Sequence, residues 1–305
     1  MRAFFFGSSA FSVPSLEAIR SSVSHVVTKR PKPKGRGYLL EDNEVKQAAA
    51  RLGIPLIEID SFKEEAAREA AALKPDLLVV ASFGLIIPKW FLEVPAVGAI
   101  NVHPSLLPKY RGPSPIQWVL WNGERETAIT IIKMSERMDA GNILYQEAQP
   151  IVPDDDAASL MDRLARRSGE IVPGIVSDIA VHGMPEGTAQ DDAEATFTPI
   201  ITKEMGHIDW NTGSLEVVRQ VRALALWPTA YTYLDGQLLK VSKASLTDGQ
   251  SGEPGQVLDV TKEGVVVAAG DGPVVIAEVQ LQGRKRMRAY EFGKGYRNLV
   301  GKKLT

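Results

Sequence analysis

A short run of consecutive apolar residues, DLLVVA at Asp76–Ala81, constrains the fold of this chain more than any other stretch. A strand that is apolar at nearly every position is typical of a parallel sheet, which helices cover on both faces. The stretch RAFFF at residues 2–6 has the same character, and a glycine turn and helical periodicity follow it. Because strands keep alternating with helices up to a long helix at Ala157–Val181, we predict a doubly wound parallel, Rossmann-like α/β domain over residues 1–187.

The composition excludes several kinds of chemistry. The chain has 305 residues, 44% hydrophobic and 24% charged, with a formal net charge of −2, which is typical of a globular protein of one or two domains. It contains no cysteine, so disulfides, thiolate metal ligands and cysteine nucleophiles are excluded. There is no run of about 18 apolar residues and there are only four histidines, so we expect neither a membrane span nor a metal site. These features favour a cytoplasmic location.

The glycine turn after the first strand does not form a dinucleotide-binding fingerprint. Gly7-Ser8-Ser9 holds one glycine, whereas the G-x-G-x-x-G pattern needs three and an acidic residue about 20 positions later. We therefore expect no nicotinamide cofactor. A ligand of another kind would still bind at the carboxyl ends of the strands.

Two polar side chains occupy the end of a later strand, in the stretch AINVHPSLLPKYRG. Asn101 and His103 are two residues apart, and in an extended strand such residues point to the same side. Pro104 then ends the strand pairing, because proline has no N–H group to donate. A strand end with incidental polar residues is the simpler interpretation, and a pair of side chains at the ligand-binding edge is the alternative.

A third polar residue follows the next predicted strand, Thr127–Met134, which is rich in β-branched residues. Asp139 precedes Ala140-Gly141, where another part of the backbone can approach closely. An aspartate in such a loop is commonly a turn or cap residue. If the strand continues the parallel sheet, however, Asp139 lies at the same edge as Asn101 and His103 and is a candidate partner for the imidazole.

An amide, an imidazole and a carboxylate without a serine or cysteine nucleophile favour acid–base and oxyanion chemistry over covalent catalysis. Asn101 could donate an N–H group to an oxygen that gains charge, and Asp139 would balance positive charge on His103. This set fits the attack of an amine on an acyl carbon, and it needs no metal. Whether His103 acts as a base or as a cation stays open.

A concentrated basic segment, KRPKPKGRG at residues 29–37, follows the second predicted strand. Its prolines and glycines exclude regular structure. A solvated surface loop is one interpretation. A contact for phosphate groups is the other, because five of the nine residues are basic in a weakly acidic chain.

The last third of the chain predicts a second domain. Residues 188–206 lack apolar periodicity and are expected to be a linker. Short β-type runs separated by turn signals then predict a small OB-like antiparallel β-barrel over residues 207–305. This part has 13 basic and 10 acidic residues, a formal +3, which leaves 22 and 27, or −5, for the part before it. A solvated edge and a surface that holds a polyanion are both compatible with this excess.

Two motifs of this chain resemble those of the 10-formyltetrahydrofolate-dependent formyltransferases. N-x-H-P-S-L-L-P-x-Y-R-G begins at Asn101, and T-I-x-x-M-x-x-x-x-D-A-G-x-I contains Asp139. The opening F-x-G-S and the stretch SFGLIIP at residues 82–88 extend the similarity over essentially the whole chain. The basic segment departs from the family, since TKRP at residues 28–31 replaces a T-Q-P-D-like stretch. The resemblance is closest to members that act on initiator methionyl-tRNA.

The resemblance implies a reaction and a set of site residues. The reaction is transfer of the formyl group of the co-substrate 10-formyltetrahydrofolate to the α-amino group of initiator methionyl-tRNA, by direct attack of the amine. The implied catalytic residues are Asn101, His103 and Asp139. The implied folate-binding residues are Ser105, Leu106, Leu107, Pro108, Phe83, Gly84 and Leu85. The implied tRNA-binding residues are Arg36, Lys34, Lys32, Arg284, Lys285 and Arg286.

Two other functions stay open from the sequence. The acceptor could be a small amine, such as a nucleotide-linked amino sugar, or the chain could bind folate or RNA without catalysis. A basic C-terminal domain favours tRNA, because a small acceptor would not need it. We expect no membrane contact, no obligate protein partner and a monomer.

Overall fold

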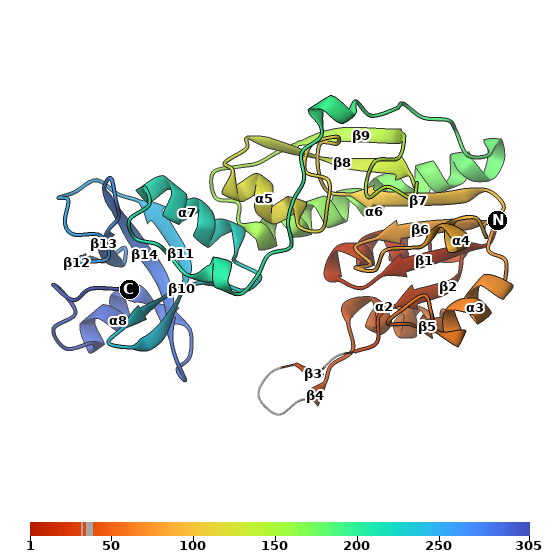
Figure 1. Cartoon of the computed structure of the whole chain (residues 1–305). Helices are drawn as coiled ribbons and strands as arrows, with labels where there is room; N and C mark the ends of the chain where they lie inside the picture. Colours follow the sequence, from red (N-terminus) through yellow and green to blue (C-terminus); the bar gives the residue numbers. More distant parts are fainter. Residues whose placement is uncertain (32, 35–38) are drawn as a thin grey trace. The chain divides into compact units, whose positions relative to one another are not determined.

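The computed structural model describes residues 1–31, 33–34 and 39–305, and the chain divides into two compact units. Unit 1 consists of Met1–Pro115, Glu126–Pro150 and Met161–Thr198. Unit 2 consists of Ile116–Arg125, Ile151–Leu160 and Pro199–Thr305. Each unit has its own sheet, and the units are described separately below (Figure 1).

Unit 1 is built on a seven-stranded sheet in the order β5-β2-β1-β6-β7-β8-β9. Five of these strands run parallel: β1 Ala3–Gly7, β2 Val23–Thr28, β5 Leu56–Glu58, β6 Leu77–Ala81 and β7 Gly98–His103. Every residue of β6 is buried, as its unbroken apolar run predicts. The predicted α/β fold class is confirmed.

The last two strands of this sheet, β8 and β9, form antiparallel pairs. β8, Glu126–Lys133, is antiparallel to β7, and β9, Ile143–Pro150, is antiparallel to β8. The expectation that residues 127–134 continue the parallel sheet is therefore wrong. The connecting helix α5, Pro115–Trp121, lies almost wholly in unit 2.

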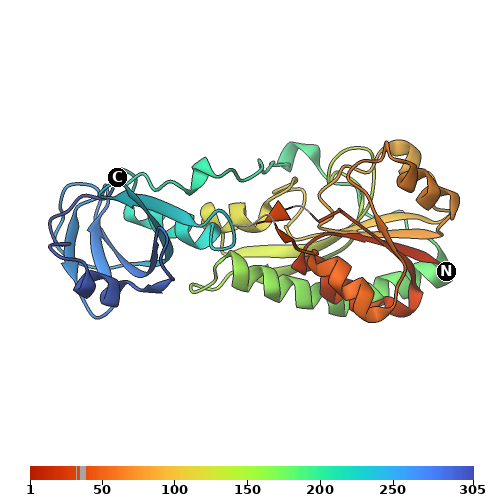
Figure 2. The same cartoon turned by 90° about the horizontal axis from the view of Figure 1, so that it is seen from below.

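Helices cover both faces of this sheet. On one face, alternate side chains of β1 and β6, among them Phe6 and Val80, pack against α3 and α4, which span Glu65–Ala72 and Lys89–Leu92. The other face carries α1, α2 and α6, which span Val13–Ala18, Glu44–Leu52 and Ala157–His182 (Figure 2). Pro173 lies inside α6 without dividing it. No helix of the described residues combines the length and apolar character that a membrane crossing requires.

Short elements complete unit 1 and lead into unit 2. The strands β3 and β4 pair with each other, and the described residues include four short 3-10 helices. Their bounds are β3 Pro33–Lys34, β4 Leu39–Leu40, η1 Ala10–Ser12, η2 Arg20–Ser22, η3 Asp192–Glu194 and η4 Glu204–Gly206.

Unit 2 holds an antiparallel sheet in the order β10-β11-β14-β13-β12, with β15 paired to β14. Its strands are β10 Ala230–Leu234, β11 Gln237–Leu246, β12 Val257–Val260, β13 Val265–Ala268, β14 Pro273–Leu281 and β15 Met287–Arg288. Its helices include α7 Ser214–Ala223 and α8 Ala289–Gly295. The predicted antiparallel domain is confirmed, whereas the described strand pairings do not by themselves close a barrel.

The C-terminal residues hydrogen-bond to both edges of this sheet. Thr305 exchanges two backbone hydrogen bonds with Tyr233 of β10, at 2.7 and 3.0 Å. Three residues earlier, the carbonyl of Lys302 accepts from the N–H of Val257 in β12, at 2.8 Å. The end of the chain thus satisfies backbone groups that an open edge would leave exposed.

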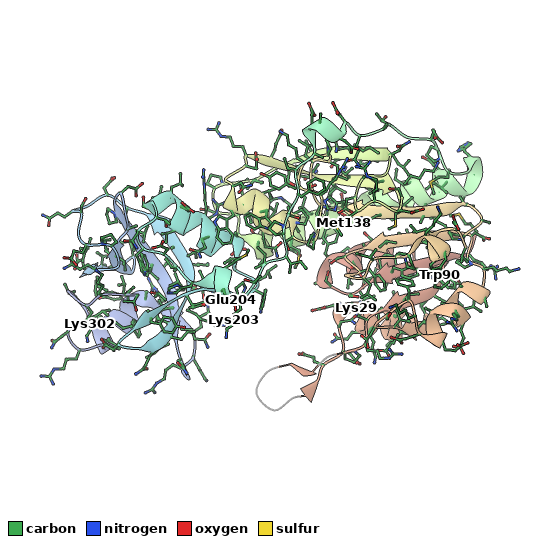
Figure 3. The ribbon with its side chains drawn as sticks, viewed as in Figure 1. Lys29, Trp90, Met138, Lys203, Glu204 and Lys302 are labelled. Carbon is green, nitrogen blue, oxygen red and sulfur yellow. The ribbon has the colours of Figure 1, made fainter. Side chains whose placement is uncertain are left out.

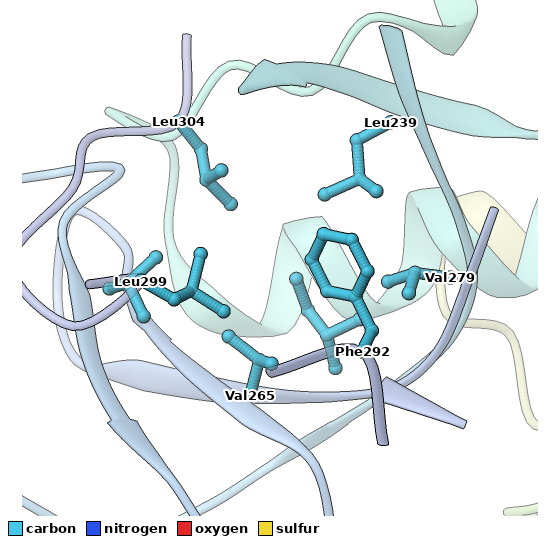
Figure 4. A pocket seen from close by; sticks show the side chains of 8 residues that line it. Leu239, Val265, Val279, Phe292, Leu299 and Leu304 are labelled. Atoms are coloured by element: carbon cyan, nitrogen blue, oxygen red, sulfur yellow. The ribbon is translucent and has the colours of Figure 1, made fainter. Parts of the chain in front are cut away.

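The interior of unit 2 is apolar. A small cavity at its centre is lined by Leu239, Val257, Val265, Ile276, Val279, Phe292, Leu299 and Leu304 (Figure 4). This lining has no polar side chain that could orient a ligand, so we interpret the cavity as imperfect packing of the core.

Candidate active site

The three polar residues singled out by the sequence meet in unit 1. The amide Nδ2 of Asn101 donates to Oδ1 of Asp139 at 3.2 Å. The Nδ1 atom of His103 lies 3.6 Å from Oδ2 of the same carboxylate, and the backbone N–H of Gly112 donates to Oδ2 at 2.9 Å. The Asp139 carboxylate is therefore shared by an amide, an imidazole and a backbone donor. Its side chain is only 13% exposed.

The ring of His103 is oriented from its other side. Nε2 lies 3.0 Å from the backbone carbonyl of Tyr110, and the side chain is 5% exposed. A carbonyl oxygen can only accept, so Nε2 carries the hydrogen of this bond. Nδ1, which faces Asp139, is thus the nitrogen at which the ring gains or loses a proton.

Asp139 reaches the site by a route that the sequence analysis did not foresee. Because β8 is antiparallel, it ends at Lys133 opposite Ile100, toward the amino end of β7 and not beside His103. The loop after β8 folds back to bring Asp139 to Asn101. The adjacency is as expected, but the reason given for it, a shared edge of parallel strands, is wrong.

The backbone of this loop is tightly constrained. Asp139 has a positive φ of 50°, a conformation that few residues other than glycine adopt. A Cβ atom at Gly141 would lie 1.7 Å from the carbonyl oxygen of Lys133, so only glycine fits there. The preceding residue, Met138, is 51% exposed, in contrast to the inward-facing Asp139 (Figure 3).

Side chains of the neighbouring antiparallel strands hold the loop that follows β7. Thr130 of β8 donates to the carbonyl of Ser105 at 2.6 Å, and Gln146 of β9 donates to the carbonyl of Leu107 at 2.9 Å. The hydroxyl of Ser105 is itself buried and donates to the carbonyl of Lys109 at 2.7 Å. These bonds fix a segment that has no regular secondary structure.

The residues predicted to bind folate lie on two loops at the carboxyl edge of neighbouring strands, β6 and β7. Their exposure differs. Phe83, Ser105 and Leu107 are buried, and Phe83 packs edge-on against Phe6 within the core. The side chains of Leu85, Leu106 and Pro108 are half-buried, and Gly84 is exposed. Only the latter four offer surface to a ligand.

The loop after β7 is linked to residues 190–192 through Arg111, Gln190 and Asp192, none of which the sequence analysis predicts as a site residue. Arg111 is 1% exposed, and its guanidinium donates to Gln190 and to Asp192. The hydrogen bond from Arg111, followed by that from Arg137, lowers the pKa of Asp192. Gln190 and Asp192 belong to the predicted linker, whose polar composition gives no signal of contact with a site.

That segment is hydrogen-bonded to unit 1 up to residue 198. The hydroxyl of Thr196 accepts from the N–H of Tyr110 at 2.8 Å, and the carbonyl of Thr196 accepts from the N–H of Arg111 at 2.9 Å. The N–H of Thr198 donates to the carbonyl of Arg111 at 2.7 Å. Residues 188–198 accordingly belong to unit 1.

The basic residues predicted to contact tRNA are only partly described. Lys32 and Arg36 lie outside the described residues, and Lys34 lies in β3, where only the backbone is described. Arg284, Lys285 and Arg286 are exposed between β14 and β15 of unit 2. Arg286 is paired with Glu278. Lys29, which precedes the undescribed residues, lies 3.5 Å through its Nζ from the carbonyl of Gly84 (Figure 3).

Comparisons with known proteins agree on the family. The family model "Formyl transferase" matches residues 3–176, and "Formyl transferase, C-terminal domain" matches residues 200–297. The chain is 40% identical over 308 residues to a protein of Geobacter sulfurreducens named methionyl-tRNA formyltransferase, covering 100% of this chain and 96% of the relative. The chain belongs to the formyl transferase family.

Solved structures share the fold at lower identity. HypX from Aquifex aeolicus in complex with tetrahydrofolic acid aligns with a TM-score of 0.65 at 20% identity, over 95% of this chain and 46% of HypX. This chain thus spans about half of HypX. An N-formyltransferase from Helicobacter canadensis, in complex with folinic acid and dTDP-3-aminofucose, aligns with a TM-score of 0.65 at 20% identity, over 90% of this chain and 98% of that one.

Proposed function

We propose that this chain transfers the formyl group of 10-formyltetrahydrofolate to the free α-amino group of initiator methionyl-tRNA, acting as a monomer in the cytoplasm. The observation that carries the proposal is the contact of Asn101 and His103 with one carboxylate, that of Asp139, in a chain 40% identical, along its full length, to a protein named methionyl-tRNA formyltransferase. The reaction forms a bond between the amine nitrogen and the formyl carbon. The bond from that carbon to N10 of the folate breaks, and the proton lost by the amine ends on N10.

Asn101 is suited to stabilise the oxygen that gains charge during this attack. Its Nδ2 carries two hydrogens, and Asp139 accepts one of them at 3.2 Å. The bond to Asp139 fixes the amide so that the second hydrogen has a defined direction. One such donor to an oxyanion contributes about 2.7–4 kcal/mol to the lowering of a barrier.

His103 is suited to handle the proton. The Tyr110 carbonyl holds Nε2, which leaves Nδ1 as the exchanging nitrogen, and Asp139 complements positive charge there. The 3.6 Å separation of Nδ1 from Oδ2 is longer than a hydrogen bond, so the pair can tighten when substrates bind. Protonation at Nδ1 would place the positive charge beside Asp139, and the second N–H of Asn101, which the same carboxylate holds, would donate to the developing oxyanion.

The two loops at the carboxyl edge are suited to hold the folate, which supplies the formyl group in activated form. Leu85 and Leu106 offer half-buried apolar surface, and Ile86 beside them is 74% exposed. An apolar wall with nearby backbone donors and acceptors fits an aromatic heterocycle. The tetrahydrofolic acid present in the HypX structure is consistent with this use of the fold.

The proposal that tRNA carries the accepting amine is supported by the charge of the chain. The part from residue 207 onward carries a formal +3 against −5 for the rest, and Arg284 and Lys285 expose their charges to solvent. Basic side chains attract phosphates without reading sequence. We extend the same role to Arg286, Lys32, Lys34 and Arg36.

The proposal is tested by incubating the purified chain with 10-formyltetrahydrofolate and methionylated initiator tRNA, and detecting formylmethionine by mass spectrometry. A dTDP-linked amino sugar, offered alone and in competition, tests the small-amine alternative. We expect formylmethionine as the preferred product. Binding of folate or tRNA without any formyl transfer, or faster formylation of the sugar, would contradict the proposal.

A further inference from the structure

Two strained backbone segments meet at the candidate site. Asp139 has a φ of +50°, and Tyr110, whose carbonyl holds His103, has a φ of +62°. Residues with side chains adopt this conformation at a cost, and they keep it only where the surroundings enforce it. Gly112, the backbone donor to Asp139, also has a positive φ, of 119°.

The side chain of Gln190 joins these two segments. Its Oε1 accepts from Nε and Nη2 of Arg111, at 3.1 and 2.8 Å. Its Nε2 donates to the carbonyl of Asp139 at 2.8 Å and to the carbonyl of Gly141 at 2.7 Å. The amide oxygen of Gln190 therefore accepts two hydrogen bonds from Arg111, and the amide nitrogen donates two to the Asp139 loop.

Because of its position in the chain, Arg111 links the hydrogen bonds of Gln190 to the groups that hold His103 and Asp139. It lies between Tyr110, which orients His103, and Gly112, which donates to the Asp139 carboxylate. Its guanidinium is buried, so little of its bonding capacity is satisfied by water. Fixing Arg111 to the Asp139 loop thus fixes His103 and Asp139 relative to each other.

We propose that Gln190 is a positioning residue for the formyl transfer. Through its four hydrogen bonds it sets the distance between the Asp139 carboxylate and Nδ1 of His103. The inference rests on the proposed function for its kinetic part, whereas its structural part stands on the contacts alone. It also gives a role to part of the segment that the sequence predicts to be only a linker.

The sharpest test is Gln190→Glu, which keeps an acceptor oxygen for Arg111 but replaces the amide donor Nε2 with a second oxygen. A carboxylate facing the carbonyls of Asp139 and Gly141 repels them, so the loop must move. We expect kcat to fall about 10- to 100-fold, because small displacements of reacting groups have effects of this size. We also expect the pH dependence of kcat to shift, with KM for both substrates nearly unchanged.

A matched control is available in unit 2. Gln220 also donates through Nε2 to two backbone carbonyls, those of Met205 at 2.8 Å and His207 at 3.0 Å. Gln220→Glu therefore removes the same kind of bonds at a place without the candidate catalytic groups. It should lower thermal stability and leave the pH profile of kcat as in the wild type. If Gln190→Glu only repeats that behaviour, or leaves kcat unchanged, the proposal is overturned.

A second measurement separates this proposal from the proposed function. The Gly112 amide donates to the Asp139 carboxylate, so its hydrogen exchange reports directly on the position of that carboxylate. We expect about tenfold faster exchange of Gly112 in Gln190→Glu and in the uncharged Gln190→Leu, and no change in Gln220→Glu. Wild-type protection of Gly112 in both Gln190 variants rejects the positioning role. Altered exchange in a chain without formyl transfer rejects only the function.

Discussion

The two units of this molecule use buried positions differently. Unit 1 buries polar and charged side chains around the candidate site, among them His103, Ser105 and Arg111, and satisfies them with hydrogen bonds. The core of unit 2 is formed mainly by aliphatic and aromatic side chains, and its basic residues Arg284 and Lys285 are exposed. Burying a polar group is costly unless it is paired, so a dense buried network indicates chemistry, whereas exposed charge indicates binding. The difference supports the proposal of catalysis in unit 1 and of polyanion contact in unit 2.

The largest expected effect breaks the polar network at His103. His103→Ala should lower kcat about 10³-fold, because it removes both the proton carrier and its charge. The measurement is single-turnover formyl transfer, with circular dichroism to verify folding. His182→Ala, at the exposed end of α6, is the control and should retain full activity. More than a tenth of wild-type activity in His103→Ala would show that the network is structural.

The second largest effect is expected from a substitution in the apolar core of unit 2. Leu239 is 3% exposed and lines the cavity of unit 2 (Figure 4). Leu239→Ala enlarges that cavity and should lower the free energy of unfolding by about 3 kcal/mol, as measured by urea titration. If unit 2 serves binding and not chemistry, kcat of the remaining folded protein stays at the wild-type value. A lower kcat at an unchanged folded fraction would argue against catalysis in unit 1 alone.

A smaller effect is expected from the exposed charges of unit 2. Changing Arg284 and Lys285 together to Glu should raise KM for tRNA about tenfold, because phosphate contacts act through charge. The value of kcat should not change. The KM for folate should not change. Lys63→Glu with Arg68→Glu, two exposed changes in unit 1, is the matched control. Equal effects of both pairs would mean that overall charge, and not this surface, attracts the tRNA.

The sequence predicts those parts of the fold that local patterns determine. The buried run at Asp76–Ala81 becomes β6, and the predicted helix Ala157–Val181 becomes α6 with one more residue. The direction of β8 could not be predicted in the same way. Strand direction is decided by tertiary contacts, which the periodicity of the sequence does not report.

The candidate site shows the same limit more sharply. The spacing of Asn101 and His103 suffices to place them together, since alternation in a strand is local. Asp139 contacts Asn101 and His103 as expected, although the parallel strand direction from which the sequence predicts this is wrong. Arg111 belongs to the motif that begins at Asn101, but nothing in the sequence indicates its partner Gln190, which lies 79 positions later.

The smallest effect sharpens the comparison by testing a charge pair of unit 1 outside the site. Hydrogen bonds from Arg167, and then from Tyr145, lower the pKa of Glu147 on β9 to about 2. A carboxyl whose pKa is lower in the folded state stabilises the fold above its unfolded pKa, and this stabilisation is lost as the pH falls from about 5 toward 2. Because Arg167 is 40% exposed, solvent screening leaves about 1 kcal/mol of it. Glu147→Gln should remove this part of the acid sensitivity in urea titrations at pH 7 and pH 3, while kcat at pH 7 is unchanged. An equal loss of stability at pH 3 in both proteins would mean that other carboxylates cause the acid sensitivity.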